Sequence, residues 1–160
     1  HDIPIGGELF LTDFLKLAGN SGRLLALNIK SDGLAIHVSN LMRDFPGLEY
    51  FVFDMSVPDM RSYLDLGMPV YCRVSEVEIT PPWLDECQGV WLDSFVKDWF
   101  EVADVKRYLN LNKAVCIVSP ELHGRQHEYL WNRIRALKNE KGLYLCTDYP
   151  EKAELFFKGG

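Results

Sequence analysis

The stretch YFVFDMSVPDMRSYLDLGMPVYCRVSE, residues 50–76, carries the pattern that decides the fold. Its two apolar runs, YFVF and VYCRV, flank a segment that opens with Pro58 and Asp59 and closes at Gly67. Continuous apolar runs indicate strands buried on both faces, whereas Pro in a first turn and Gly after a last turn indicate a helix. The stretch therefore predicts a strand, a helix and a second strand that runs parallel to the first.

The same unit repeats on either side of this stretch. Apolar runs that end in polar residues recur along the chain, each followed by a segment of helical periodicity. The runs are LLALNIK (24–30), YFVFDMS (50–56), PVYCRVSE (69–76), GVWLDSF (89–95), AVCIVSPE (114–121) and LYLCTD (143–148). A doubly wound sheet concentrates its ligand groups at one switch point, but a barrel gathers the ends of all its strands around one mouth. The pattern predicts an α/β fold of the TIM-type (β/α) barrel.

Length limits this barrel. An eight-stranded barrel typically takes about 250 residues, and this chain has 160 residues and starts at His1 without an initiator Met. We expect one partial barrel domain over residues 1–160, incomplete at its N-terminus, with about six of eight strands. Open strand edges favour association, so a homodimer that covers the open barrel edge is expected.

Composition restricts the partners. Hydrophobic residues make up 48% and charged residues 25% of the chain, and no apolar run is long enough to span a bilayer. The net charge of −6 disfavours nucleic acid as a partner, because phosphate backbones need a clustered basic face. The four cysteines show no ligand spacing, which predicts buried, reduced thiols. We expect a cytoplasmic protein with no membrane span.

Three segments together resemble the glycerophosphodiester phosphodiesterase family. The stretch GLYLCTDYPEKAELFF (142–157) resembles the family's closing strand and helix, in which Thr-Asp leads through a Pro into the last helix. His1 and Asp2 resemble its His-Asp motif, and LLALNIK resembles its strand that ends in Glu-x-Lys. The segment SPELHGR (119–125) is distinctive and indicates a divergent branch. The order of these elements is kept over essentially the whole chain.

The resemblance implies a hydrolase of lipid metabolism, a phosphoric diester hydrolase that cleaves a small phosphodiester with a divalent cation, Mg or Ca. Family members use two histidines as acid and base, and carboxylates hold the metal against the phosphate. By this mapping His1 is a catalytic acid/base, Lys30 contacts the phosphate, and Asn28 stands at a metal ligand position. Asn supplies no negative charge, so we expect the cation to bind weakly or not at all, and this chain to be inactive or nearly so as a hydrolase.

The strand ends supply further candidates for substrate binding, namely Arg73, Glu121, His123 and Arg125. Each type suits an anionic ligand, because guanidinium and imidazole groups donate charge-assisted hydrogen bonds to phosphate. One alternative is a loop held by its own pairing of Arg125 with Glu121. Another is that Lys30 is a solvated edge charge.

Several further alternatives stay open. His1 can be a frayed terminal residue, and Asp54 and Asp93 can cap helices instead of serving a site; Asp148 is expected to cap the last helix. A second function is also open, in which a non-catalytic barrel binds an anionic metabolite or sugar phosphate through Lys30, Arg73 and Arg125.

Overall fold

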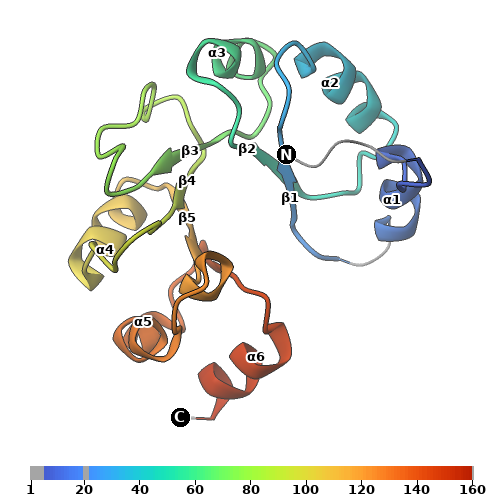
Figure 1. Ribbon diagram of the computed structural model, residues 1–160. Helices are drawn as coiled ribbons and strands as arrows, with labels where there is room; N and C mark the ends of the chain where they lie inside the picture. The colour runs from blue at the N-terminus through green and yellow to red at the C-terminus, as the bar shows by residue number, and fades with distance from the viewer. Residues whose placement is uncertain (1–5, 20–21, 160) are drawn as a thin grey trace. The chain divides into compact units, whose positions relative to one another are not determined.

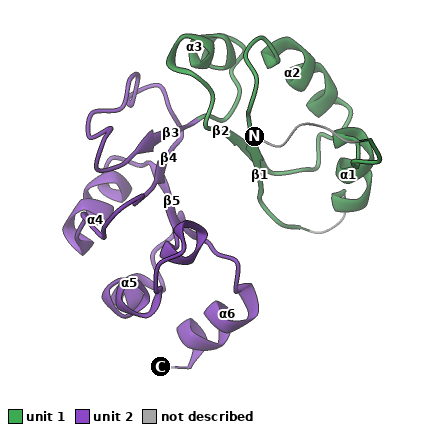
Figure 2. Cartoon of the chain, in the orientation of Figure 1, with its two compact units in different colours: residues 1–70 green, residues 71–160 purple. Residues whose placement is uncertain are grey.

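The computed structural model describes residues 6–19 and 22–159 and shows an α/β protein with parallel strands (Figure 1). The chain forms two compact units, residues 1–70 and residues 71–160 (Figure 2). The first unit alternates helices and strands along the sequence, as the apolar runs predict, but in the second unit residues 75–88, between its first two strands, form no helix. The prediction of a single domain stays a prediction.

The first unit holds a pair of parallel strands and the helices around them. Strands β1 and β2 pair in parallel, from Leu25 opposite Tyr50 to Asn28 opposite Phe53. Its elements are α1 (Leu11–Ala18), β1 (Leu25–Asn28), α2 (Ala35–Arg43), β2 (Tyr50–Phe53) and α3 (Val57–Asp65). Helix α3 begins where the sequence indicates, because Ser56 Oγ accepts a hydrogen bond from the backbone N–H of Asp59 and Pro58 lies in the first turn.

The second unit holds a four-stranded parallel sheet in the order β3-β4-β5-β6. The helices α4, α5 and α6, drawn in yellow, orange and red, follow strands β4, β5 and β6 in turn (Figure 1). Its elements are β3 (Tyr71–Val74), β4 (Gly89–Leu92), α4 (Val102–Asn110), β5 (Ala114–Val118), η1 (Pro120–His123), α5 (Glu128–Ile134), η2 (Arg135–Leu137), β6 (Leu143–Cys146) and α6 (Pro150–Lys158).

The middle strands of this sheet are buried on both faces. All four residues of β4 are buried, and so are the last four of β5, whereas the edge strand β6 is only partly covered. Packing between the strands is close at Gly89, where a Cβ would lie 2.6 Å from the ring of Tyr71 and 2.8 Å from the carbonyl oxygen of Ala114. Glycine is therefore required at the start of β4.

The six predicted strands are confirmed, and a helix follows each of them except β3, which a loop through Pro81 and Pro82 connects to β4. Tyr71, Trp91 and Phe53 are buried, as expected for core residues. The cysteines are free thiols, three of them buried and Cys146 half-buried. The described strand pairs form two separate parallel sheets and no closed barrel. A closed barrel is therefore a proposal.

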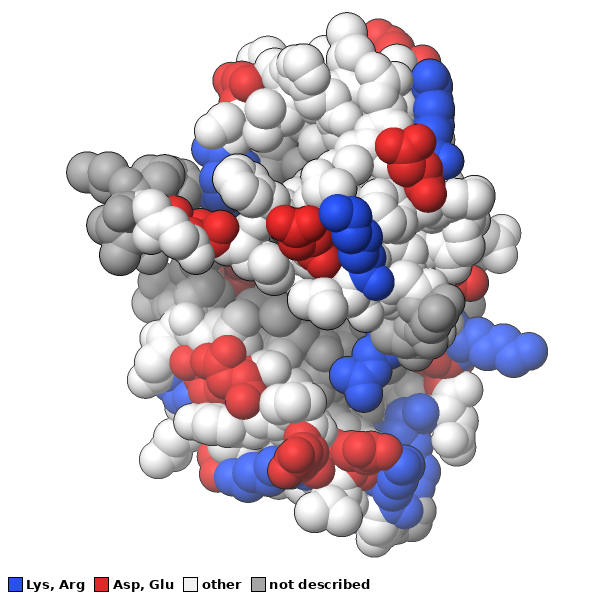
Figure 3. All heavy atoms as spheres, turned by 90° about the vertical axis from the view of Figure 1, so that its right-hand side faces the viewer, with Lys and Arg blue, Asp and Glu red and all other residues white. Residues whose placement is uncertain are grey.

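Charges of both signs are mixed on one face of the molecule. Basic and acidic side chains are interspersed on the face drawn in Figure 3, without an extended area of one sign among its described residues. Within residues 6–19 and 22–159, none of the helices combines the length and the hydropathy that a bilayer crossing requires.

Candidate functional site

Polar side chains gather where the parallel strands of the second unit end. Arg73 lies near the end of β3, Asp93 directly follows β4, and Glu121 and His123 lie in η1 directly after β5. Because β3, β4 and β5 are neighbours with the same direction, their C-terminal ends share one edge of the sheet. The sheet thus brings together residues that lie up to 50 positions apart in the sequence.

Asp93 and His123 form a hydrogen-bonded pair at this edge. Nε2 of His123 lies 2.7 Å from Oδ1 of Asp93, and the Asp93 side chain is only 8% exposed. A carboxylate oxygen only accepts hydrogen bonds, so Nε2 carries the proton and Nδ1 keeps its lone pair while the imidazole is neutral. Nδ1 makes no hydrogen bond to another described residue. This pairing is suited to general acid/base chemistry, because the carboxylate fixes the tautomer and steadies the imidazolium.

An aromatic contact joins this pair to Arg73. The ring of Phe95 packs edge-on against His123, with centroids 5.2 Å apart, and the Arg73 guanidinium lies 5.7 Å from the centroid of the same ring. Nε of Arg73 also donates to Glu78 at 2.9 Å. Arg73, Asp93, Phe95 and His123 together are called the strand-end cluster below. They place a cation, a fixed imidazole and an apolar ring within one contiguous set of contacts.

Glu121 ties the ends of β5 and β6 together. Its carboxylate accepts hydrogen bonds from the hydroxyls of Ser119 and Thr147 and from the backbone N–H of Asp148. Burial alone would raise the pKa of Glu121, but the hydrogen bonds from Ser119, Thr147 and the backbone outweigh it and lower the pKa below 4.5. The carboxylate is thus fully engaged by its own chain, which favours a structural role over ligand binding.

Arg125 is held away from Glu121. Its Nη1 donates to Asp98 at 2.7 Å and its Nη2 donates to the carbonyl oxygen of Ser94 at 2.6 Å. Gly124, with φ of 69°, ends η1 in the left-handed conformation and separates Arg125 from the preceding turn. The alternative of a loop held by an Arg125–Glu121 pair is therefore wrong. Arg125 instead anchors the loop after β4.

In the first unit, Lys30 pairs with Asp54, so it is not simply a solvated edge charge. The Lys30 side chain is 46% exposed and the Asp54 side chain 17% exposed. Asp54 adopts φ of 69°, a conformation that is strained for a residue with a side chain. Asn28, the last residue of β1, is exposed. His1 lies outside the described residues.

The expected capping roles are wrong. The N-cap of α3 is Ser56 and that of α4 is Glu101, so neither Asp54 nor Asp93 caps a helix. The N-cap of α6 is Tyr149, not Asp148. The chain extends for two or more residues beyond Asp54 and Asp93 before helical geometry begins, which leaves their carboxylates available for the pairs described above.

The donors for a divalent cation do not fit. Within the described ranges no group of three or more His, Cys, Asp and Glu side chains is arranged to hold a metal ion. Asn28 offers one neutral amide oxygen, and Asp54 is engaged by Lys30. A hard cation typically needs about six oxygen ligands with several negative charges. The described residues therefore give no support for a metal-dependent step.

No known family model, curated protein or solved structure matches this chain. The resemblance to the glycerophosphodiester phosphodiesterases thus rests on the short motifs alone, and the assignment of function rests on the geometry of the site.

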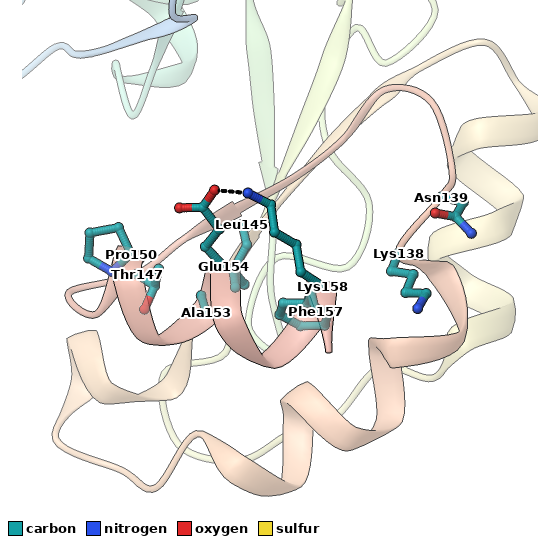
Figure 4. Close-up of a pocket in the computed structure, with 9 residues that line it drawn as sticks. All are labelled: Lys138, Asn139, Leu145, Thr147, Pro150, Ala153, Glu154, Phe157 and Lys158. Carbon is teal, nitrogen blue, oxygen red and sulfur yellow. Dashed lines mark hydrogen bonds and ion pairs between the residues drawn. The ribbon is translucent and has the colours of Figure 1, made fainter. Parts of the chain in front are cut away.

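A groove separate from the strand-end cluster lies between β6 and α6 (Figure 4). It has a volume of about 500 Å³ and is lined by apolar side chains that include Leu145, Ala153 and Phe157. Glu154 and Lys158 form an ion pair on its α6 side. Thr147 and Pro150, which follow β6, also line the groove together with Lys138 and Asn139, so its lining is part polar and it reaches the end of that strand.

Sequence reasoning found most of these residues but missed how they pair. His123 was expected to bind substrate, and the structure instead links it to Asp93 of the neighbouring strand. Phe95 was not expected at the site. Register alone does not point to either residue, because Phe95 and His123 lie three and five residues beyond the ends of β4 and β5 and depend on the conformation of the loop and of η1.

Proposed function

We propose that the chain is a glycerophosphodiester phosphodiesterase-like protein with a TIM-type (β/α) barrel fold. The barrel is supported by parallel pairing in both units and by the alternation of strand and helix, which only the loop between β3 and β4 interrupts. In this proposal the strand-end cluster binds the phosphoryl group of a small phosphodiester. The single observation that carries the proposal is the 2.7 Å contact between His123 and Asp93 where β4 and β5 end.

The cluster can act on a phosphodiester in two ways. The Arg73 guanidinium provides positive charge for the phosphoryl oxygens, as arginine does in many phosphate sites. Nδ1 of His123 can accept a proton from an attacking water or hydroxyl, and Asp93 stabilises the imidazolium that results. The same imidazolium can then return the proton to the leaving alkoxide. The ring of Phe95 packs against one side of the imidazole.

A steady-state assay with glycerophosphocholine tests this function. We expect slow turnover in the wild type, because Arg73 is shared with Glu78 and no metal step contributes. His123→Ala should lower kcat by about a hundredfold or more, the usual contribution of an acid/base. Asp93→Asn should lower kcat less and shift its pH profile, since the imidazolium loses its carboxylate partner.

The matched control is His37→Ala, which removes an exposed histidine of α2 from the first unit. It should leave kcat and KM unchanged. Turnover that is equal in wild type and in His123→Ala would exclude His123 as the acid/base, and an absence of both turnover and glycerophosphocholine binding in the wild type would exclude the function.

The alternative of a non-catalytic anion binder is less well supported. Lys30, Arg73 and Arg125, the cations on which it depends, each pair with a carboxylate of the same chain. A metabolite would have to displace Asp54, Glu78 or Asp98 to use them. We propose as a partner a second copy of the chain along the free edge of β6, since unpaired strand edges recruit further strands.

A further inference from the structure

A carboxylate of the chain itself occupies a cradle of backbone donors beside the strand-end cluster. The backbone N–H groups of Phe95, Val96 and Lys97 donate to Glu76 at 3.1, 2.6 and 3.4 Å. These consecutive groups are called the amide nest below. Three backbone donors on one carboxylate are the arrangement by which proteins bind oxyanions without any cationic side chain.

The surroundings of the amide nest also favour negative charge. Burial would raise the pKa of Glu76, yet the hydrogen bonds from Val96, Phe95, Lys97 and its own backbone outweigh burial and lower the pKa. The N–H groups therefore stabilise an anion more than burial penalises it. Lys97 adds an exposed cation at the end of the nest.

Two polar atoms next to the nest lack partners. Ser94, which directly precedes the nest, is fully buried, and its Oγ has no hydrogen-bond partner among the described residues. Nε of Arg125 is likewise buried and unpartnered within that part of the chain, although the same guanidinium donates to the Ser94 carbonyl oxygen. Buried donors without partners are costly and point to a ligand or water that completes them.

We propose that the amide nest is an oxyanion-binding site for the phosphoryl group of a ligand, and that Glu76 fills it as an internal stand-in until that ligand displaces it. The identity of the ligand as a phosphoryl group rests on the proposed function, whereas the existence of the oxyanion site does not. Phe95 belongs to both the nest and the strand-end cluster, because its backbone N–H donates to Glu76 and its ring packs against His123.

Glu76 is a tethered competitor, and tethered groups act at an effective concentration in the millimolar range. Its removal should therefore raise the apparent affinity of the nest for a free anion by about tenfold or more. Asp93 and Asp98 carry negative charge on the same loop, but each is already paired, with His123 and with Arg125.

The test is a titration of ¹⁵N-labelled protein with inorganic phosphate, followed through the amide resonances of Phe95, Val96 and Lys97. Glu76→Ala should show saturable shifts at these amides with an affinity at least about tenfold higher than the wild type. Phosphate should also restore hydrogen-exchange protection at the same amides, which a purely structural role of Glu76 does not predict. Glu140→Ala, an exposed change in the same unit, should behave as the wild type.

The outcomes separate cleanly. Equal phosphate affinity in wild type and Glu76→Ala, or no response of these amides to phosphate in the variant, would overturn the oxyanion site. Tighter binding of acetate than of phosphate would overturn the phosphoryl assignment. If Glu76→Ala does not fold, Glu76→Gln is the second variant; it weakens the internal acceptor and should still bind phosphate more tightly than the wild type. None of these readouts depends on turnover, so the nest and the hydrolytic function can fail independently.

Discussion

Nε1 of Trp131, in α5, donates a hydrogen bond to Oγ of Ser119 at 2.8 Å, and the Ser119 hydroxyl in turn donates to Glu121. Both Trp131 and Ser119 are fully or almost fully buried. The indole thus fixes the direction of the hydroxyl, since a serine that accepts from one partner has its single proton left for the other. The buried Trp131 and Ser119 therefore determine the position of the Glu121 carboxylate after β5.

Ser119→Ala should destabilise the protein by about 1–3 kcal/mol, because it leaves the buried Trp131 Nε1 without its acceptor. Chemical denaturation with tryptophan fluorescence as the readout measures the loss. Ser62→Ala is the control variant. It removes a serine hydroxyl from α3, in the other unit, that is not part of such a chain of hydrogen bonds. Equal stability of Ser119→Ala and wild type would show that the relay contributes nothing.

Gly89→Ala should cost about 1–3 kcal/mol through overpacking, because the new Cβ has no room beside the Tyr71 ring and the Ala114 carbonyl. Gly47→Ala is the matched control, with nothing within 4 Å of the added Cβ. The midpoint of urea unfolding should fall for Gly89→Ala only. A midpoint that is unchanged by Gly89→Ala would mean that β3 and β5 can move apart without loss.

The left-handed backbone of Asp54 should be visible in a comparison of two variants. Asp54→Gly and Asp54→Ala both remove the carboxylate and its ion pair with Lys30, but only glycine adopts φ of 69° without strain. Asp54→Gly should therefore be the more stable of the two by up to about 1 kcal/mol. Thermal unfolding measures the order, and the reverse order would show that residue 54 is not held in this conformation.

The lowered pKa of Glu121 predicts a dependence of stability on pH. A carboxyl whose pKa is lower in the folded state contributes stability above its unfolded pKa, near 4.5, and loses it as the pH falls through the folded value. The difference in unfolding free energy between wild type and Glu121→Gln should therefore be largest near neutral pH and shrink below about pH 4. Glu140→Gln serves as the control and should show no such trend. A constant difference across this range would contradict the linkage.

A second copy along β6 predicts a concentration-dependent dimer. Tyr144 is 40% exposed on this strand, and Leu155 of α6 is 75% exposed. Sedimentation velocity should show the dimer, and Leu145→Lys, which places a charge in the groove between β6 and α6, should shift the equilibrium to monomer. A monomer at all concentrations would rule out this partner.

Periodicity predicts the six described strands and the α-helices that follow five of them, because continuous apolar runs and their Pro and Gly boundaries are local signals, but it does not predict that β3 leads to β4 without a helix. Periodicity does not predict the N-caps: these are Ser56 and Tyr149 rather than Asp54 and Asp148. The reason is that moving a helix boundary by one or two residues costs little free energy.

Individual side chains at the strand ends were predictable, but their partners were not. Arg125 was within reach of Glu121 in the sequence, yet the left-handed turn at Gly124 directs it to Asp98. The pairing of Asp93 with His123, 30 residues away, depends on the register of β4 and β5. Such contacts are long-range, and a single sequence specifies them only through the fold.

Each candidate cation, Lys30, Arg73 and Arg125, is paired with its own carboxylate. At a distance, such a pair acts as a dipole rather than a net charge, and the potential of a dipole falls off faster than that of an isolated charge. These pairs therefore give an approaching anion little guidance, and the net charge of −6 repels it, so the encounter rate should rise as added salt screens that repulsion. In the function and the oxyanion site proposed above, recognition is therefore an exchange at contact, in which the incoming group replaces an internal carboxylate.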